Sequence, residues 1–172
     1  MATHLYTDAS FNRESQIAVS GYLLFKNSQD HDAGINDQSI IQTVSFQETT
    51  NIRAEIRGML NALVKLEEFQ AKDPKGEIKI YTDCQTITHL LSRRKNLEAS
   101  GFISNRKQEV LPNADLYKKF FTLYDQVNPE IMWVKGHSAY QGNNLIRENF
   151  RYIDKLVRKK LRMSLKTQGN LS

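Results

Sequence analysis

The tripeptide Tyr-Thr-Asp occurs twice in this chain, at residues 6–8 and 81–83, and each copy ends a short apolar run. Both runs are rich in β-branched and aromatic residues, which is typical of strands packed on a hydrophobic core. If the two strands lie side by side, Asp8 and Asp83 meet at one edge of a sheet. Since two carboxylates in contact repel each other, a fold that joins them normally holds cations between them. The alternative is that each Asp only begins a turn or caps a helix.

Length and cysteine content limit the kind of protein that this chain can be. At 172 residues it has the size of one domain, and we expect a single domain over residues 1–166 with a disordered tail over 167–172. The one cysteine, Cys84, excludes an internal disulfide and fits a reducing compartment. The sequence has no apolar run of membrane-spanning length and no signal-peptide pattern. We therefore expect a soluble, cytoplasmic monomer without an obligate protein partner.

The formal charge of +5 is unevenly distributed along the chain. From Arg147 to the end, eight Lys and Arg residues stand against Glu148 and Asp154, which gives +6 and leaves −1 for the preceding residues. A second cluster, from Arg93 to Lys119, holds seven basic and three acidic residues. Basic patches on an otherwise neutral chain indicate a polyanionic partner such as nucleic acid. The alternative is that these residues lie on exposed helix faces and only keep the protein soluble.

Hydrophobic periodicity predicts an α/β fold. Apolar and alternating runs predict five strands, at residues 5–7, 17–25, 39–47, 77–82 and 131–134. Helical spacing predicts helices over residues 52 to about 72, 86–91, 115–127 and 147–166. We expect a polar loop over 27–37 and a basic loop or short-helix excursion over 92–112. This order describes one five-stranded mixed sheet flanked by helices, with three antiparallel strands and two parallel ones.

Two further acids stand where the helical pattern places apolar residues. Glu55 lies in the first turn of its predicted helix, at the margin of the apolar stripe that begins with Ile52. At 100° per residue, Asp154 falls inside the apolar stripe of the last helix, about 20° from the direction of Leu161. A bound metal would explain this orientation, because an unpaired buried carboxylate costs several kcal/mol. The alternatives are favourable contact of Glu55 with the helix N-terminus and a surface ion pair between Asp154 and Arg158.

Four acids are thus expected to point toward one end of the sheet: Asp8, Glu55, Asp83 and Asp154. All-oxygen sites of this kind suit Mg²⁺ or Mn²⁺, and the chain lacks the Cys and His spacing of a zinc site. Two such ions about 4 Å apart can hold the attacking and leaving oxygens of an in-line displacement at phosphorus. The pattern therefore predicts a two-ion site for chemistry on a phosphate ester.

Five segments in one order resemble ribonuclease H of the type I class. They are TDAS at residues 7–10, TTNIRAE at 49–55, YTDCQ at 81–85, WVKGHS at 133–138 and IDKLVR at 153–158. The resemblance spans nearly the whole chain and implies an RNase H-like fold for the domain. It implies that the four acids hold two Mg²⁺ ions, or Mn²⁺, with Asp8 bridging both. It also implies endonucleolytic cleavage of the RNA strand of RNA–DNA hybrids, with 5′-phosphate and 3′-hydroxyl ends.

The resemblance assigns roles to residues outside the four acids as well. His137 matches the family's histidine that helps proton transfer or the release of product and metal. The positions that match substrate-contacting residues or the family's basic handle are Ser10, Thr50, Asn51, Gln85, Arg93, Arg94 and Lys95. Recognition of a hybrid at such positions relies on groove shape and the 2′-hydroxyl more than on base sequence.

The chain departs from the family pattern in two places. The turn after Asp8 has no glycine, although this turn usually carries several, and Glu14 stands where an asparagine is common. The interval from His137 to Asp154 is longer than usual, which leaves Glu148 as a remote substitute for Asp154.

Two other functions remain open on the sequence alone. A nuclease or strand-transfer domain of this fold that acts on DNA would use the same acids. A non-catalytic module that only binds nucleic acid would keep the fold, although four retained acids argue against it. A proofreading exonuclease is disfavoured, because Ser10 occupies the place of its second acid.

Overall fold

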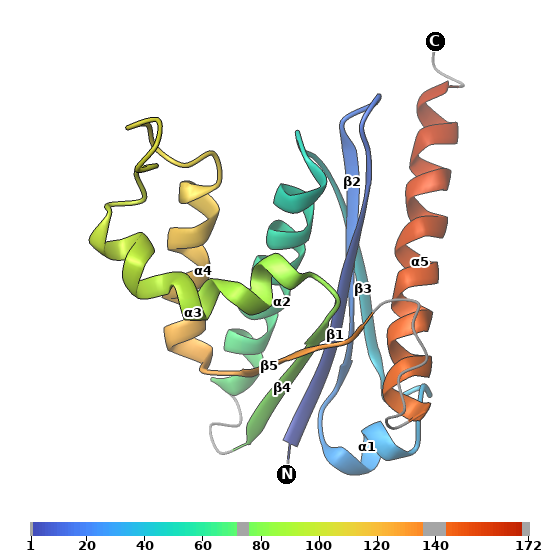
Figure 1. Ribbon diagram of the computed structural model, residues 1–172. Helices are drawn as coiled ribbons and strands as arrows, with labels where there is room; N and C mark the ends of the chain where they lie inside the picture. The colour runs from blue at the N-terminus through green and yellow to red at the C-terminus, as the bar shows by residue number, and fades with distance from the viewer. Residues whose placement is uncertain (1, 72–75, 136–143, 170–172) are drawn as a thin grey trace.

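The computed structural model describes residues 2–71, 76–135 and 144–169, and it contains one five-stranded mixed sheet with the order β3-β2-β1-β4-β5 (Figure 1). The strands are β1 (Ala2–Asn12), β2 (Ile17–Phe25), β3 (Ile40–Gln47), β4 (Glu77–Thr82) and β5 (Glu130–Trp133). The first three strands form an antiparallel meander, whereas β4 pairs parallel to β1 and β5 parallel to β4. The predicted fold class is confirmed.

Helices cover both faces of the sheet. They are α1 (Ser28–Asp32), α2 (Asn51–Gln70), α3 (Gln85–Ala99), α4 (Ala114–Val127) and α5 (Asn144–Gly169). The helices α2, α3 and α4 pack on one face, where their apolar side chains join those of β1 and β4 in the larger core. The long helix α5 packs on the other face, against side chains of β1 and β2 (Figure 1). No helix in the described ranges combines the length and the hydropathy that crossing a bilayer requires.

Several local predictions were wrong. The expected polar loop over 27–37 contains α1, which Asn27 caps by accepting a hydrogen bond from the Asp30 amide. The helix predicted over 86–91 continues through half of the basic segment to Ala99. Ile52 was expected in the core, but it is 45% exposed because the first turn of α2 extends beyond the packed region.

The last helix is longer than predicted at both ends. It begins at Asn144 and ends at Gly169, so residues 167–169 are helical where we expected a tail. Its apolar side continues to the predicted end of the domain, since Leu161 and Leu165 both pack on the core. The rest of the expected tail, residues 170–172, lies outside the described residues.

Two glycines allow α2 and α5 to approach the sheet closely at one level. A Cβ atom at Gly21 of β2 would lie 2.9 Å from Val157 Cγ1 of α5. On the other face, a Cβ atom at Gly58 of α2 would lie 3.0 Å from the Ser20 Cβ. Since Gly21 is the register partner of Asp8, both helices come closest to the sheet beside this aspartate.

Candidate metal centre

The two Tyr-Thr-Asp copies lie side by side in matching register. β1 and β4 are parallel neighbours, and Tyr6 of the first copy pairs with Tyr81 of the second. Asp8 is therefore at the same level as Asp83, which follows the last residue of β4. Asp8 is 6% exposed, although it carries a carboxylate. The predicted meeting of the two strands is confirmed.

Glu55 joins these two aspartates from the fifth position of α2, just beyond the first turn in which it was expected. This helix begins at Asn51, with Thr50 as its N-cap, so Glu55 lies where α2 starts beside the end of β1. Single carboxylate oxygens of Asp8, Glu55 and Asp83 lie within 4.8 Å of one another. Three oxygen donors at this spacing have the chemistry that Mg²⁺ and Mn²⁺ prefer.

The electrostatics of the three acids are those of a site built for a cation. Burial raises the pKa of Asp8, and the charges of Asp83 and Asp154 raise it further. Burial likewise raises the pKa of Glu55, followed by the charges of Asp8 and Asp83. The Ala9 backbone amide opposes the increase for both acids, but it does not offset it. At neutral pH these carboxylates must therefore either hold protons or share a cation.

Asp154 lies at the border of this cluster rather than within it. Its Oδ1 atom forms an ion pair with Arg158 Nε at 2.7 Å, and 20% of its side chain is exposed. The alternative partner foreseen from the sequence, Arg158, is thus present. Asp154 is nevertheless close enough for its charge to raise the pKa of Asp8. Glu148, the remote substitute, is exposed and accepts a hydrogen bond from Asn144.

The polar residues expected to contact substrate lie at the starts of the helices near the acids. Thr50 accepts a hydrogen bond from the Arg53 amide at 3.2 Å, and Asn51 lowers the pKa of Glu55 by hydrogen bonding. Gln85 is exposed as the first residue of α3. Ser10 is half-buried on β1, two residues beyond Asp8.

Two further predictions concern segments near the site. The glycine-free turn after β1 is closed by Asn12 Oδ1, which accepts from the Ser15 amide, and by Gln16 at a φ of 55°. Asn12 thus supplies the turn that glycine was expected to supply. His137 lies outside the described residues.

The basic residues of α3 are not equivalent. Arg93 and Lys95 are exposed, as a contact with a polyanion would require. Arg94 instead donates to both carboxylate oxygens of Asp125, at 2.5 and 2.7 Å, and to Glu98 at 2.8 Å. Its guanidinium therefore holds α3 against α4, and this pairing competes with any contact to substrate.

Sequence reasoning missed an ion-pair network that fixes the start of α2. Arg53 donates to the buried Glu48 at 2.8 Å and to both oxygens of Asp115 at 3.0 Å. Glu48 also accepts from Arg57 at 3.2 Å. The network joins the end of β3 to α2 and α4, and so it orients the turn that carries Glu55. An acid just before a helix with arginines five and nine residues later is the signal that indicates it.

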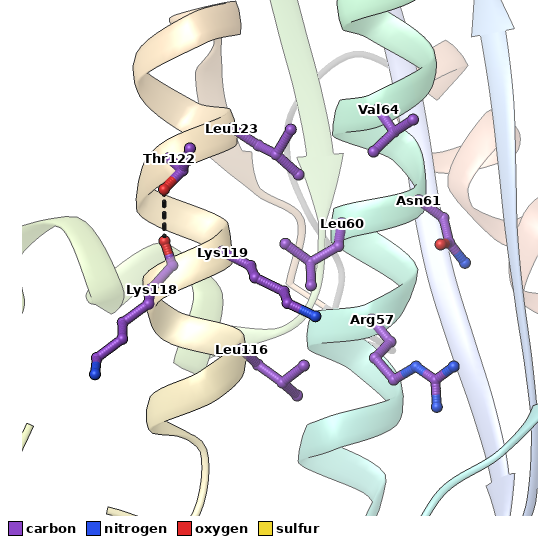
Figure 2. A pocket seen from close by; sticks show the side chains of 9 residues that line it. All are labelled: Arg57, Leu60, Asn61, Val64, Leu116, Lys118, Lys119, Thr122 and Leu123. Atoms are coloured by element: carbon purple, nitrogen blue, oxygen red, sulfur yellow. Dashed lines mark hydrogen bonds between the residues drawn. The ribbon is translucent and has the colours of Figure 1, made fainter.

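A separate hollow lies between α2 and α4. It has a volume of about 480 Å³ and an apolar floor made by Leu60, Val64, Leu116 and Leu123. Arg57, Lys118 and Lys119 also line it, and Figure 2 shows that its lining side chains come from these two helices alone. None of the three carboxylates lines it, so it is distinct from the candidate metal centre.

Several known proteins are similar to this chain in sequence. The family model described as RNase H matches residues 1–161. A Ribonuclease H of Francisella philomiragia is 30% identical over 139 residues, which cover 80% of this chain and 81% of that protein. A Ribonuclease HI of Synechocystis is 30% identical over 125 residues, covering 63% and 74%. A Ribonuclease H of Desulforamulus reducens is 30% identical over 103 residues, and this chain covers 60% of its length.

A solved structure agrees on the fold. The foamy viral protease-reverse transcriptase in complex with double-stranded DNA contains a chain that superposes with a TM-score of 0.58. The alignment covers 86% of this chain and 90% of that one, at 19% sequence identity. At this identity the likeness concerns the arrangement of strands and helices alone.

Proposed function

Because this chain belongs to the RNase H family, we propose that it is a nuclease that cleaves the RNA strand of RNA–DNA hybrids internally. The observation that carries the proposal is the trio of Asp8, Glu55 and Asp83, whose carboxylate oxygens lie within 4.8 Å of one another. A purely structural role would not favour three neighbouring acids, since the charge of Asp83 raises the pKa of both Asp8 and Glu55, and that of Asp8 raises the pKa of Glu55 further.

The donor set fits divalent ions, and we propose that two Mg²⁺ ions, or Mn²⁺, bind there. Asp8, Glu55, Asp83 and Asp154 would hold these ions. The chemistry supplied by a bound pair is activation of the attacking water and stabilisation of charge on the leaving oxygen. Cleavage of this kind leaves 5′-phosphate and 3′-hydroxyl ends.

The chain's own residues hold and orient the substrate around this centre. Thr50, Asn51 and Gln85 stand at exposed helix starts, where they reach the minor groove and the 2′-hydroxyls of a hybrid. Arg93 and Lys95 offer unburied positive charge to the phosphates. The ion pair from Arg158 keeps Asp154 at the edge of the carboxylate cluster. We assign His137 to proton transfer or product release on the basis of its sequence position.

A cleavage assay with matched substrates tests this proposal. The protein is incubated with an end-labelled RNA–DNA hybrid, duplex RNA and duplex DNA of one sequence, with Mg²⁺ or with a chelator. We expect cuts in the RNA strand of the hybrid only, and only with Mg²⁺. Cleavage of duplex DNA at an equal rate would instead assign the chain to DNA. Binding of the hybrid without cleavage in any divalent ion would indicate a non-catalytic module.

A further inference from the structure

The helix α5 carries a row of cations that the proposed metal centre does not explain. The row, here called the α5 stripe, consists of Arg151, Lys155, Arg158, Arg162 and Lys166. Successive members are three or four residues apart, so they lie within a sector of about 80° on the helix surface. All five side chains are exposed.

The α5 stripe begins beside Asp154 on the helix surface and faces away from the sheet. The helix buries Val157 on the sheet, and Ser164, whose Oγ lies 3.4 Å from Ser45 Oγ of β3, is on the same sheet-facing side. Asp154, whose charge reaches Asp8, marks the flank beside the carboxylates. At 100° per residue the stripe is next to Asp154 and turned away from Ser164. The row therefore passes beside Asp154, whose charge reaches Asp8, and continues along α5 to Lys166.

The charge pattern indicates an external anion. The chain has no acidic residue after Asp154. In the described parts of the chain, Arg158 is the one stripe residue with a carboxylate partner, and that partner is Asp154 itself. The arginines elsewhere that hold the fold together, such as Arg53 and Arg94, are paired with acids. Like charges one turn apart destabilise a helix, so a row of five cations carries a cost in stability that an external anion would offset.

We propose that the α5 stripe binds the phosphate backbone of nucleic acid that extends past the carboxylates. The proposal rests on the proposed function, because the same strand would occupy both regions. From Arg151 to Lys166 the stripe is about 22 Å long at 1.5 Å per residue, enough to follow several successive phosphates. Contacts to phosphates carry no sequence information, so in this role the stripe adds affinity without sequence preference.

The test compares two triple variants with equal loss of charge. In the stripe variant, Lys155, Arg162 and Lys166 are changed to Gln. In the control variant, Lys26, Lys65 and Lys160 are changed to Gln, because these lysines lie off the stripe and outside the basic cluster from Arg93 to Lys119. Both are made in the Asp8→Asn background so that the substrate stays intact. Thermal melting confirms that both variants fold.

Binding of a labelled hybrid of about 20 base pairs is measured by fluorescence anisotropy over a range of salt concentrations. We expect the stripe variant to bind about tenfold more weakly than the control at low salt. Its slope of log affinity against log salt should fall by about 3 units, one for each lost phosphate contact. Equal affinity and equal slope in the two variants would overturn the proposal.

Two further measurements distinguish this proposal from the proposed function and from binding to a membrane surface. Cleavage is measured on the same substitutions with Asp8 restored, so a protein that binds through the stripe but never cuts refutes the proposed function alone. Vesicles of phosphatidylcholine and phosphatidylserine provide the other anionic surface. A stripe variant that loses vesicle binding but binds the hybrid like the control would overturn the proposal in favour of a membrane surface.

Discussion

Two buried polar groups, at opposite ends of one face of β1, have opposite kinds of surroundings. His4 and Asp8 lie on the same side of the strand, four residues apart, and they are 8% and 6% exposed. The surroundings of His4 satisfy a neutral ring, whereas those of Asp8 add further negative charge. Equal burial therefore does not imply an equal role. The partners of a buried polar group indicate whether it stabilises the fold or serves a functional site.

At the amino end of β1, buried aromatic side chains both stack and form hydrogen bonds with one another. The rings of His4 and His31 stack with their centroids 3.9 Å apart. Tyr6 Oη lies 2.7 Å from His31 Nε2, and Tyr81 Oη lies 3.1 Å from His4 Nδ1. Burial is the main reason why the pKa of His4 is lowered to about 4, so its ring is neutral at pH 7. At the other end, Asp8 has no comparable set of neutral partners, and its pKa is raised.

The strongest way to separate the two ends is to neutralise Asp8. We expect Asp8→Asn to reduce hybrid cleavage about a thousandfold, equivalent to about 4 kcal/mol in the activation barrier. The same change removes repulsion among buried acids, so the free energy of unfolding without metal should rise by about 1 to 3 kcal/mol. Initial cleavage rates and urea unfolding in chelator measure the two effects.

The matched control for this variant is Asp37→Asn, which removes one charge from an exposed residue. It should leave both quantities within experimental error. An Asp8→Asn protein that is less stable than wild type would contradict our account of the carboxylate cluster, because it would mean that Asp8 stabilises the fold.

At the amino end of β1, a substitution should lower stability and leave cleavage almost unchanged. We expect His31→Ala to lower the free energy of unfolding by about 3 kcal/mol, because it removes a buried ring and one of the hydrogen-bond partners of Tyr6 Oη. Cleavage per folded molecule should stay within about twofold of wild type. Urea unfolding and activity well below the melting temperature measure the two effects, and a large loss of activity in the folded variant would extend the functional site to this end.

Sequence patterns predicted the carboxylate end of β1 better than the histidine end. The strand runs and the repeated tripeptide are local signals, so they indicated β1, β4 and the pairing of Asp8 with Asp83. His31 has no such signal, because it stands in a polar stretch and its ring partners come from β1, β2 and β4. Its burial is a property of the tertiary structure alone.

Helical periodicity was informative only where another element covers the helix. It correctly placed Ile56 and Leu63 in the core, but it also placed Ile52 there, although this side chain is 45% exposed. For Asp154 it gave the correct flank, yet it could not decide between a shared cation and the ion pair with Arg158. For Arg94 composition predicted a free charge, since the acid that pairs with it, Asp125, is far away in sequence.

A third test lowers the pH to protonate His4 at the amino end of β1. Because the pKa of His4 is about 4 in the folded protein and near 6.5 in the unfolded chain, the unfolded chain binds more protons between these values. Stability should therefore fall by about 2 kcal/mol as the pH goes from about 6.5 to about 4. Besides burial, the charges of His31 and Lys79 lower this pKa, and Asp32 opposes them.

The variant His4→Phe isolates this contribution from that of the carboxylates. It cannot take up a proton at this position, so its stability should change less over the same pH range, by about 2 kcal/mol. Urea unfolding at half-unit pH steps gives both curves. Parallel curves for the two proteins would show that His4 does not titrate in this window and that another group carries the loss.

The smallest expected effect concerns metal binding at the carboxylate end. A ligand that binds only the folded state stabilises it according to its concentration, so Mg²⁺ at about ten times its dissociation constant should add about 1.4 kcal/mol. Glu55→Gln should lose most of this gain while it keeps the fold, whereas His31→Ala should retain all of it despite its lower baseline. Thermal melting at fixed ionic strength, with Ca²⁺-free buffers and NaCl as the compensating salt, measures the increments. If Mg²⁺ stabilised the Glu55→Gln variant as much as wild type, the ion would bind elsewhere. The acids around Glu55, whose pKa burial raises, would then be held together by shared protons and not by a cation.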